Sequence, residues 1–298
     1  MISAYTEGKK KSTFSSWKAS TADSCFCNEV IDENKILDCS AKSCVFVGIS
    51  MKKGSITRVK FEHCIFFNCY FRGVEFDNVS FTGCKFIACN FKTVRVSNCT
   101  LDYSEWSHCH IDFDQVMANL PRFANVRREL LIHMRTNAKL VGNDEDAKRY
   151  IFEIESCTRE HLLERVWSRT RYYREKRLPL LERVTSLRDY IINIVECAVW
   201  GYGEKPSRVA ISGLVAIISF ALYYFFSGDP LQEEHHALSI VEELRGAVFF
   251  SATTFACNTP GMFSSGLMNF PITSTAEALL GVIFIGVIAA ALHRSISK

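Results

Sequence analysis

The sequence predicts a multidomain protein with a β-solenoid, an α-helical linker and a two-span α-helical membrane domain, in that order. Three observations lead to this prediction. An apolar residue recurs at every fifth position early in the chain, apolar residues then recur at helical spacing, and two apolar runs lie in the last third. We expect a flexible N-terminal tail (1–30), a solenoid (31–112), a cytoplasmic helical linker (113–208) and the membrane domain (209–298).

The first 22 residues are polar and contain lysines, and they lack the apolar core that a secretory signal needs. This composition predicts a flexible tail. The cysteines are concentrated further on, since ten of the thirteen lie within residues 25–109. In a short secreted protein such a concentration would indicate disulfide bonds. The absence of a signal in this segment and the spacing of the cysteines argue against that interpretation.

A period of five organises the cysteine-rich segment. The apolar anchor positions are Phe46, Met51, Ile56, Phe61, Phe66, Phe71, Phe76, Phe81, Phe86, Phe91, Val96, Leu101, Trp106 and Ile111, with a fainter extension back through Ala41, Ile36 and Ile31. Two residues before many anchors stands a small residue, most often cysteine. Neither a helix nor a strand has a period of five, so the chain must turn a corner in each unit.

This pattern resembles the pentapeptide-repeat family, over about residues 46–111. The resemblance implies a right-handed quadrilateral β-helix with one repeat per face and four per coil. Free cysteine is small and easily buried, which suits an inner column of side chains. A redox or metal role for these thiols is the less favoured alternative, and Cys25 and Cys27 lie outside the register without an explanation.

Some soluble members of that family mimic DNA through an acidic face. Here residues 36–112 contain nine basic and seven acidic residues, a net charge of the opposite sign. We therefore expect no nucleic-acid partner or mimicry. The solenoid is interpreted as a scaffold or recognition surface for a cytoplasmic partner or ligand of unknown identity.

Helical spacing replaces the five-residue period in residues 113–208. Gly142 and Asn143 separate two predicted helices that we expect to pack antiparallel, with Asp144 or Asp146 as the cap of the second. A third helix carries an apolar stripe from Leu181 to Ala198 and is predicted to lie along the inner membrane face, where it could pull on the first span. The linker ends in residues 200–206, WGYGEKP, which resemble the motif before the first span of membrane-bound pentapeptide-repeat proteins.

Two apolar runs are candidates for membrane spans. Residues 209–226 would form a helix of ~27 Å, close to the ~30 Å hydrocarbon core of a bilayer. Residues 278–292 are shorter and reach spanning length with residues 273–277, which places Glu277 near one interface. Between the runs, residues 247–260 are too short to cross and end in irregular sequence. Such backbone is tolerated at membrane depth only inside protein or beside water, so a re-entrant pore helix is predicted.

This arrangement resembles the two-transmembrane channel domain of the potassium-channel superfamily, with residues 249–255 in the place of its pore helix. The candidate pore residues are Thr254, Phe255, Ala256, Cys257, Asn258, Thr259, Pro260 and Gly261, and Gly286 is a candidate bend in the second span. The last glycine alone matches the potassium filter, and Thr259 and Pro260 are incompatible with its stacked carbonyl rings. The resemblance implies a homotetramer, because one pair of spans cannot enclose a pore.

Charge distribution predicts the topology. Residues 159–208 contain eleven basic residues and seven acids, whereas residues 227–273 contain one base and five acids. By the positive-inside rule, both termini are cytoplasmic and the loop is outside, in a multi-pass protein of the bacterial inner membrane. Its partners are then the lipid bilayer and a permeant ion of unknown identity and sign.

An enzyme is not expected. The sequence has no phosphate loop, nucleophile motif or zinc spacing, and the histidines near residues 108–110 and 235–236 form no recognisable site. We predict no catalytic residues, metal or cofactor. The predicted function is that of an ion-channel-like protein that could be gated through its cytoplasmic part. The alternative is a membrane-anchored scaffold or binding protein without conduction.

Overall fold

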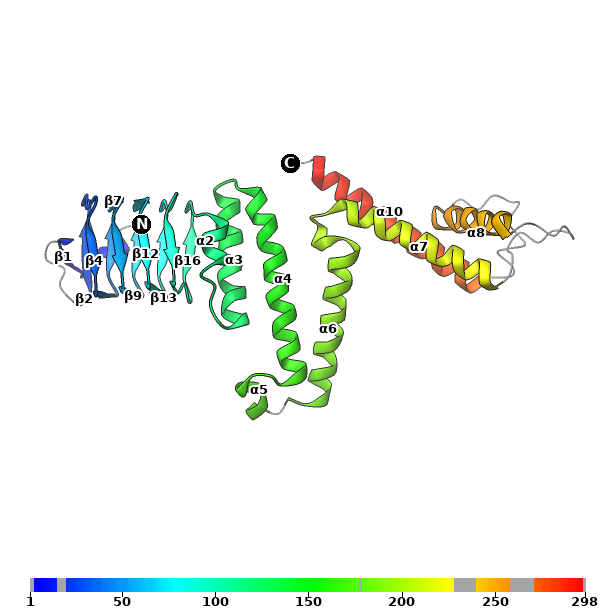
Figure 1. Ribbon diagram of the computed structural model, residues 1–298, viewed down its shortest axis with the longest axis horizontal. Helices are drawn as coiled ribbons and strands as arrows, with labels where there is room; N and C mark the ends of the chain where they lie inside the picture. Colours follow the sequence, from blue (N-terminus) through cyan, green and yellow to red (C-terminus); the bar gives the residue numbers. More distant parts are fainter. Residues whose placement is uncertain (1–2, 15–19, 177, 228–239, 258–270, 297–298) are drawn as a thin grey trace, which may run out of the picture. The chain divides into compact units, whose positions relative to one another are not determined.

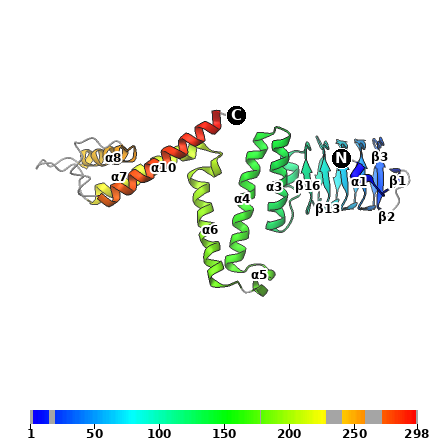
Figure 2. The ribbon, with the colours of Figure 1, turned by 180° about the vertical axis from the view of Figure 1, so that it is seen from behind.

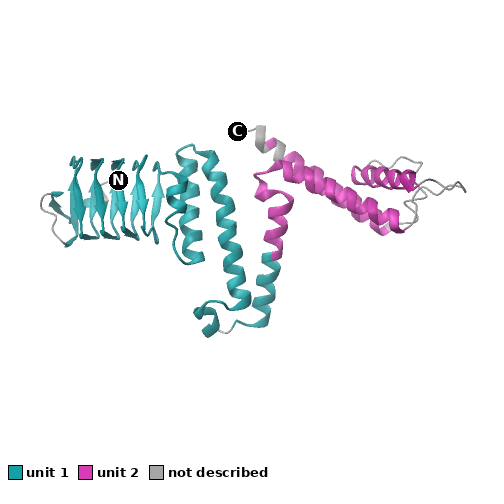
Figure 3. Ribbon diagram, viewed as in Figure 1, with its two compact units in different colours: residues 1–190 teal, residues 191–298 magenta. Residues whose placement is uncertain are grey.

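The computed structural model describes residues 3–14, 20–176, 178–227, 240–257 and 271–296 (Figure 1). The chain divides into two compact units, residues 1–190 and 191–298 (Figure 3). The division lies inside one helix, rather than at the boundary expected at residue 208.

The first unit begins with a β-solenoid of about four turns. Its parallel strands form four sheets, in the orders β1-β3-β6-β10-β14-β16, β7-β11, β4-β8-β12-β15 and β2-β5-β9-β13. The strands are β1 Lys10–Ser12, β2 Ser20–Ala22, β3 Ser24–Cys27, β4 Lys35–Leu37, β5 Ser40–Lys42, β6 Val45–Val47, β7 Ser50–Lys52, β8 Ser55–Thr57, β9 Lys60–Glu62, β10 Ile65–Phe67, β11 Tyr70–Arg72, β12 Glu75–Asp77, β13 Ser80–Thr82, β14 Lys85–Ile87, β15 Arg95–Ser97 and β16 Glu105–Ser107.

Stacked aromatic rings fill the interior of the solenoid. In the first sheet, from β3 onward, the central residue of each strand pairs with the central residue of the strand in the next coil. The aromatic residues at these positions form one column: Phe26, Phe46, Phe66, Phe86 and Trp106. Successive ring centroids lie 5.0, 4.7, 4.9 and 4.1 Å apart. These distances match the spacing of neighbouring strands, ~4.8 Å, so the coil repeat itself brings the rings into contact. The predicted five-residue register is confirmed.

Left-handed backbone makes the corners between strands. A residue with positive φ recurs every five positions, from Asp23 to His108, always two residues after an anchor. Glycine occupies only three of these corners, at Gly48, Gly73 and Gly83. Asparagine and aspartate, which tolerate this conformation better than most residues, occupy several others. The corner predicted from the period is therefore a single residue.

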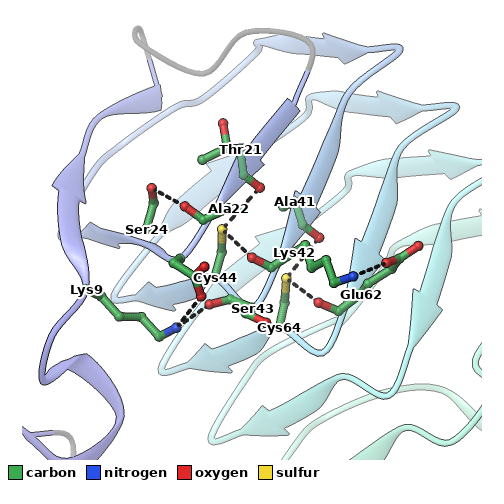
Figure 4. A network of polar contacts seen from close by, with 11 residues as sticks. Lys9, Thr21, Ala22, Ser24, Ala41, Lys42, Ser43, Cys44, Glu62 and Cys64 are labelled. Carbon is green, nitrogen blue, oxygen red and sulfur yellow. Dashed lines mark hydrogen bonds and ion pairs between the residues drawn. The ribbon is translucent and has the colours of Figure 1, made fainter.

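The cysteine column is confirmed as an inner column, and its thiols bond to the backbone. The thiols of Cys44, Cys64, Cys69, Cys84, Cys89 and Cys99 each donate to a carbonyl 23 residues earlier, with sulfur-to-oxygen distances of 3.3–3.7 Å. Figure 4 shows this bond for Cys44 and Cys64. Burial raises the pKa of the Cys89 and Cys99 thiols, so they stay protonated at neutral pH. These cysteines act as small donors that join one coil to the next.

The solenoid starts earlier than the sequence analysis expects. The prediction of a flexible tail up to residue 30 is wrong for β1, β2 and β3, which pair with one another or with later coils. Phe26 lies in the anchor register and is fully buried, while the ring of Phe14 packs on it at 5.1 Å. The aromatic side chain of Phe14 helps to cover the end of the apolar column.

Helices cover the other end of the solenoid, where α3 lies beside β16 in both views (Figures 1 and 2). The helices of this unit are α1 Ser3–Thr6, α2 Phe113–Met117, α3 Ala124–Leu140, α4 Asp144–Trp167, α5 Arg171–Lys176 and the start of α6, Leu180–Val199. α3 and α4 pack antiparallel, as predicted. The cap of α4 is Asn143, whose Oδ1 accepts from the amide of Asp146, and not either of the predicted aspartates.

Amide side chains from these helices complete the last coil. Asn137 in α3 accepts from the backbone amide of Cys109 at 2.7 Å and donates to its carbonyl at 2.8 Å. Asn119 accepts from the amide of Cys99 at 2.9 Å, and Gln115 accepts from the amide of Val96 at 3.0 Å. A solenoid end without such partners would expose an open strand edge. The helical cap therefore satisfies backbone groups that a further coil would otherwise bond.

The second unit contains the end of α6, the 3₁₀ turn η2 Gly201–Gly203, and the helices α7 Pro206–Ser227, α8 Ile240–Phe255 and α10 Pro271–Ile296. Within the described residues, two helices are long and apolar enough to cross a membrane: α7, with mean hydropathy 2.2, and residues 272–290 of α10, with mean hydropathy 2.0. α8 packs against both of them. It begins seven residues before the predicted re-entrant segment, and its 16 residues span ~24 Å.

Candidate functional site

The predicted pore segment is described up to its fourth residue. Thr254 and Phe255 end α8 and are buried, whereas Ala256 and Cys257 are exposed. Cys257 has φ +53°, a left-handed conformation typical of a helix C-terminus. The remaining candidates, Asn258, Thr259, Pro260 and Gly261, lie outside the described residues.

The end of α8 is held closely against α10. A Cβ atom built on Gly281 would lie 1.8 Å from the carbonyl oxygen of Phe255, so only glycine permits this approach. The ring of Phe255 also contacts that of Phe284, with centroids 5.6 Å apart, and the thiol of Cys257 donates to the carbonyl of Ala278 at 3.5 Å. The backbone that begins the predicted pore segment is therefore fixed against the second apolar helix.

A buried carboxyl group joins all three helices. The hydroxyl of Tyr224 in α7 donates to Oε2 of Glu277 in α10 at 2.7 Å, and the hydroxyl of Ser251 in α8 donates to Oε1. The Ser251 hydroxyl also lies 2.9 Å from the carbonyl oxygen of Ile217, an alternative acceptor for its one proton. Glu277, Tyr224 and Ser251 are all fully buried. We call these three residues the carboxyl cluster.

This cluster is not evident from the sequence pattern. The pattern places Glu277 near a membrane interface and gives no sign of its partners. An ionisable residue inside an apolar helix is expensive to bury and is a candidate functional residue for that reason alone. This signal could have singled out Glu277, but not Tyr224, which is 53 residues away in the chain.

Gly286, the predicted bend, lies within the continuous helix α10, and a Cβ atom there would meet nothing within 4 Å. Its role in bending stays a prediction. Gly286 differs in this respect from Gly281, five residues earlier, which the sequence analysis did not select.

A short junction connects α6 to α7. Gly201, Tyr202 and Gly203 all have positive φ, of 57°, 56° and 77°. The Tyr202 hydroxyl donates to Oδ1 of Asn193 in α6 at 2.8 Å, and the Arg208 guanidinium donates to the carbonyl of Cys197. The WGYGEKP motif thus forms a compact turn that is hydrogen-bonded to the end of α6 and the start of α7.

Ion pairs link the outer surface of the solenoid from coil to coil. Arg58 with Asp38, Arg95 with Glu75, and Lys85 with Glu105 are each 20 residues apart, with nitrogen-to-oxygen distances of 2.6, 2.8 and 2.8 Å. These bases and acids partly neutralise one another. Within the part of the chain that the structure describes, no three His, Cys, Asp or Glu side chains lie close enough together to hold a metal ion.

The comparisons with known proteins concern the solenoid. The family described as pentapeptide repeats matches residues 55–92 and 64–102, in eight copies, which confirms the predicted repeats there. Two solved structures of the plasmid-mediated fluoroquinolone resistance protein QnrB1 are similar to this chain. A trypsin-treated variant shares 16% identity, covers 35% of this chain and 59% of its own, and has a TM-score of 0.20. The full-length protein shares 14% identity, covers 34% of this chain and 60% of its own, and has a TM-score of 0.14.

This chain therefore spans about three fifths of the QnrB1 chains that it matches. Comparison with curated protein sequences finds no match.

Proposed function

We propose that this protein is an ion-channel-like membrane protein, in which α7 and α10 cross the inner membrane and α8 is a re-entrant pore helix. The observation that supports this most directly is the carboxyl cluster. A helix shorter than the bilayer core is tied by hydrogen bonds to two apolar helices that are long enough to cross it. In this arrangement the non-helical residues after Phe255 are surrounded by protein rather than by lipid. This is required because the amides of non-helical backbone find no hydrogen-bond partners in lipid.

Four copies of the unit surround the pore in this proposal. α8 exposes large apolar side chains at Val241, Leu244, Val248 and Phe249. In a homotetramer these side chains pack against the neighbouring copy. Residues 254–261 line the pore, and because they carry no charge at neutral pH, no charged ring selects the sign of the ion.

The cytoplasmic part is proposed to control the pore. The apolar stripe of α6 is exposed at Leu181, Val184, Leu187, Ile191 and Ile194, which suits a helix that lies along the membrane surface. Since the WGYGEKP turn bonds α6 to α7, a displacement of α6 would be passed to the first span. The solenoid and its unidentified partner or ligand would act through this connection.

Ion flux into liposomes tests the proposal. The full-length protein is reconstituted and compared with Asn258→Trp under potassium, sodium and chloride gradients. A matched control is Ile211→Trp, which introduces the same side chain at a position that is 60% exposed on α7. We expect flux from the wild type and from Ile211→Trp, and a block by Asn258→Trp. An oligomeric, correctly inserted protein that carries no flux in any gradient would contradict an open pore, and would favour a closed channel awaiting its signal or the membrane-anchored scaffold.

A further inference from the structure

Two cysteines at the start of the solenoid lie outside the inner column. Cys25 and Cys27 flank the buried anchor Phe26 in β3, so both side chains point away from the interior on the same face of the strand. Their sulfur atoms lie 3.0 Å apart, and both thiols are free. This contact differs from those of the column cysteines, whose thiols donate to backbone carbonyls.

The two thiols differ in accessibility. Cys25 is 3% exposed, whereas Cys27 is exposed to solvent. Burial and the contact with Cys27 raise the pKa of Cys25 to about 12, against the opposing effect of Lys11 and Lys9. A reagent from solvent therefore meets Cys27 first, and Cys25 is held next to it as a second, protected thiol.

Basic residues accompany the pair. Lys11 in β1 is the direct partner of Cys25 across the parallel pair β1–β3. Lys9 forms an ion pair with Asp23, at 3.6 Å, two residues before Cys25. Both lysines lower the pKa of Cys25, but burial and the contact with Cys27 outweigh them. The close contact between an exposed thiol and a protected one is therefore the feature that favours thiol–disulfide exchange over a purely structural role.

We propose that Cys25 and Cys27 form a reversible dithiol–disulfide site whose substrates are small disulfides, the oxidised forms of low-molecular-weight thiols. The Cys27 thiolate attacks one sulfur of the small disulfide, which forms a mixed disulfide and releases one small thiolate. Cys25 then loses its proton and attacks the Cys27 sulfur, which breaks the mixed disulfide and releases the second small thiolate. The two protein thiols are oxidised, the small disulfide is reduced to two thiols, and the two protons pass to the released thiolates.

The test uses the full-length protein in detergent and oxidised glutathione as the probe. After incubation at mildly alkaline pH, free thiols are blocked by alkylation and the peptide with residues 25 and 27 is analysed by mass spectrometry. We expect this peptide to be lighter by two hydrogens and to resist alkylation until dithiothreitol is added. The internal disulfide should exceed the mixed disulfide at least about tenfold, because the second attack is intramolecular.

Two variants separate the steps. Cys25→Ser should stop at glutathione bound to Cys27, and Cys27→Ser should leave Cys25 unmodified. Exposed Cys257 reports that the reagent is active. The proposal is overturned if wild-type protein accumulates glutathione on Cys27 as fully as Cys25→Ser does. It is equally overturned if both thiols stay free while Cys257 is modified.

Discussion

Replacement of Glu277 by leucine tests whether the carboxyl cluster holds α8 against the two apolar helices. The substitution removes the carboxylate that accepts from the buried Tyr224 hydroxyl, whereas Ser251 keeps the carbonyl of Ile217 at 2.9 Å. Loss of such a buried hydrogen bond costs about 1–3 kcal/mol. At about 1.4 kcal/mol for each factor of ten, the equilibrium for local opening should change by about 5- to 150-fold.

Two further variants make this prediction specific. Glu277→Gln should be tolerated, because the glutamine side chain can replace both contacts. Its carbonyl oxygen can accept from the Tyr224 hydroxyl, and its amide nitrogen can donate to the Ser251 oxygen. The Ser251 hydroxyl then donates its proton to the carbonyl of Ile217. The double variant Glu277→Leu with Tyr224→Phe should be less destabilised than the sum of its two single variants, since the hydrogen bond between the two residues can be lost only once. The two substitutions should therefore be coupled rather than additive.

Hydrogen exchange in lipid nanodiscs measures the effect at α8. We expect exchange of the α8 amides to be faster in Glu277→Leu by the factor given above, and close to wild type in Glu277→Gln. Equal exchange in the leucine and glutamine variants would refute the reasoning. So would a double variant as unstable as the sum of its two single variants.

Three other predictions concern parts of the molecule with defined contacts. Asn137→Leu should speed hydrogen exchange in the last coil of the solenoid by at least about tenfold, because it leaves the buried amide and carbonyl of Cys109 without the Asn137 side chain. The control Thr136→Ala, at the neighbouring exposed position, should leave the exchange unchanged. Gly281→Ala should reduce assembly and ion flux, as measured by size-exclusion chromatography and liposome flux, because its methyl group would meet the backbone of α8. Burial raises the pKa of Cys89, so alkylation at pH 8 should be slow in folded protein and fast after denaturation, and equal rates in both states would contradict the buried column.

The solenoid was largely predictable because its geometry repeats in the sequence. Every fifth side chain must fill the interior, so the anchors are apolar and the small column is often cysteine. The start was missed although Phe26 stands 20 residues before Phe46, in the same register. The corners are harder to predict from the sequence. Lys53, Arg58 and Tyr103 adopt left-handed conformations, although residues of these types rarely do so.

Contacts between distant segments could not be predicted in this way. Asn137 caps a coil that ends 28 residues earlier, and nothing in the helical pattern of α3 distinguishes it from an ordinary surface amide. The partners of Glu277 depend on how three helices are rotated about their axes. A single sequence specifies which residues are apolar, but it does not give that rotation.

Membrane sidedness tests the re-entrant arrangement most directly. One cysteine is introduced at Gln232 or at Ser264, which precede and follow α8 in the sequence. Native Cys27 is kept as the marker of the solenoid, and the other exposed cysteines are replaced by serine. Intact cells are then labelled with a thiol reagent that cannot cross the membrane. The account predicts that positions 232 and 264 are both labelled from outside, and Cys27 only after permeabilisation. Labelling of 232 and 264 from opposite sides of the membrane would show that α8 crosses it, and would contradict the account.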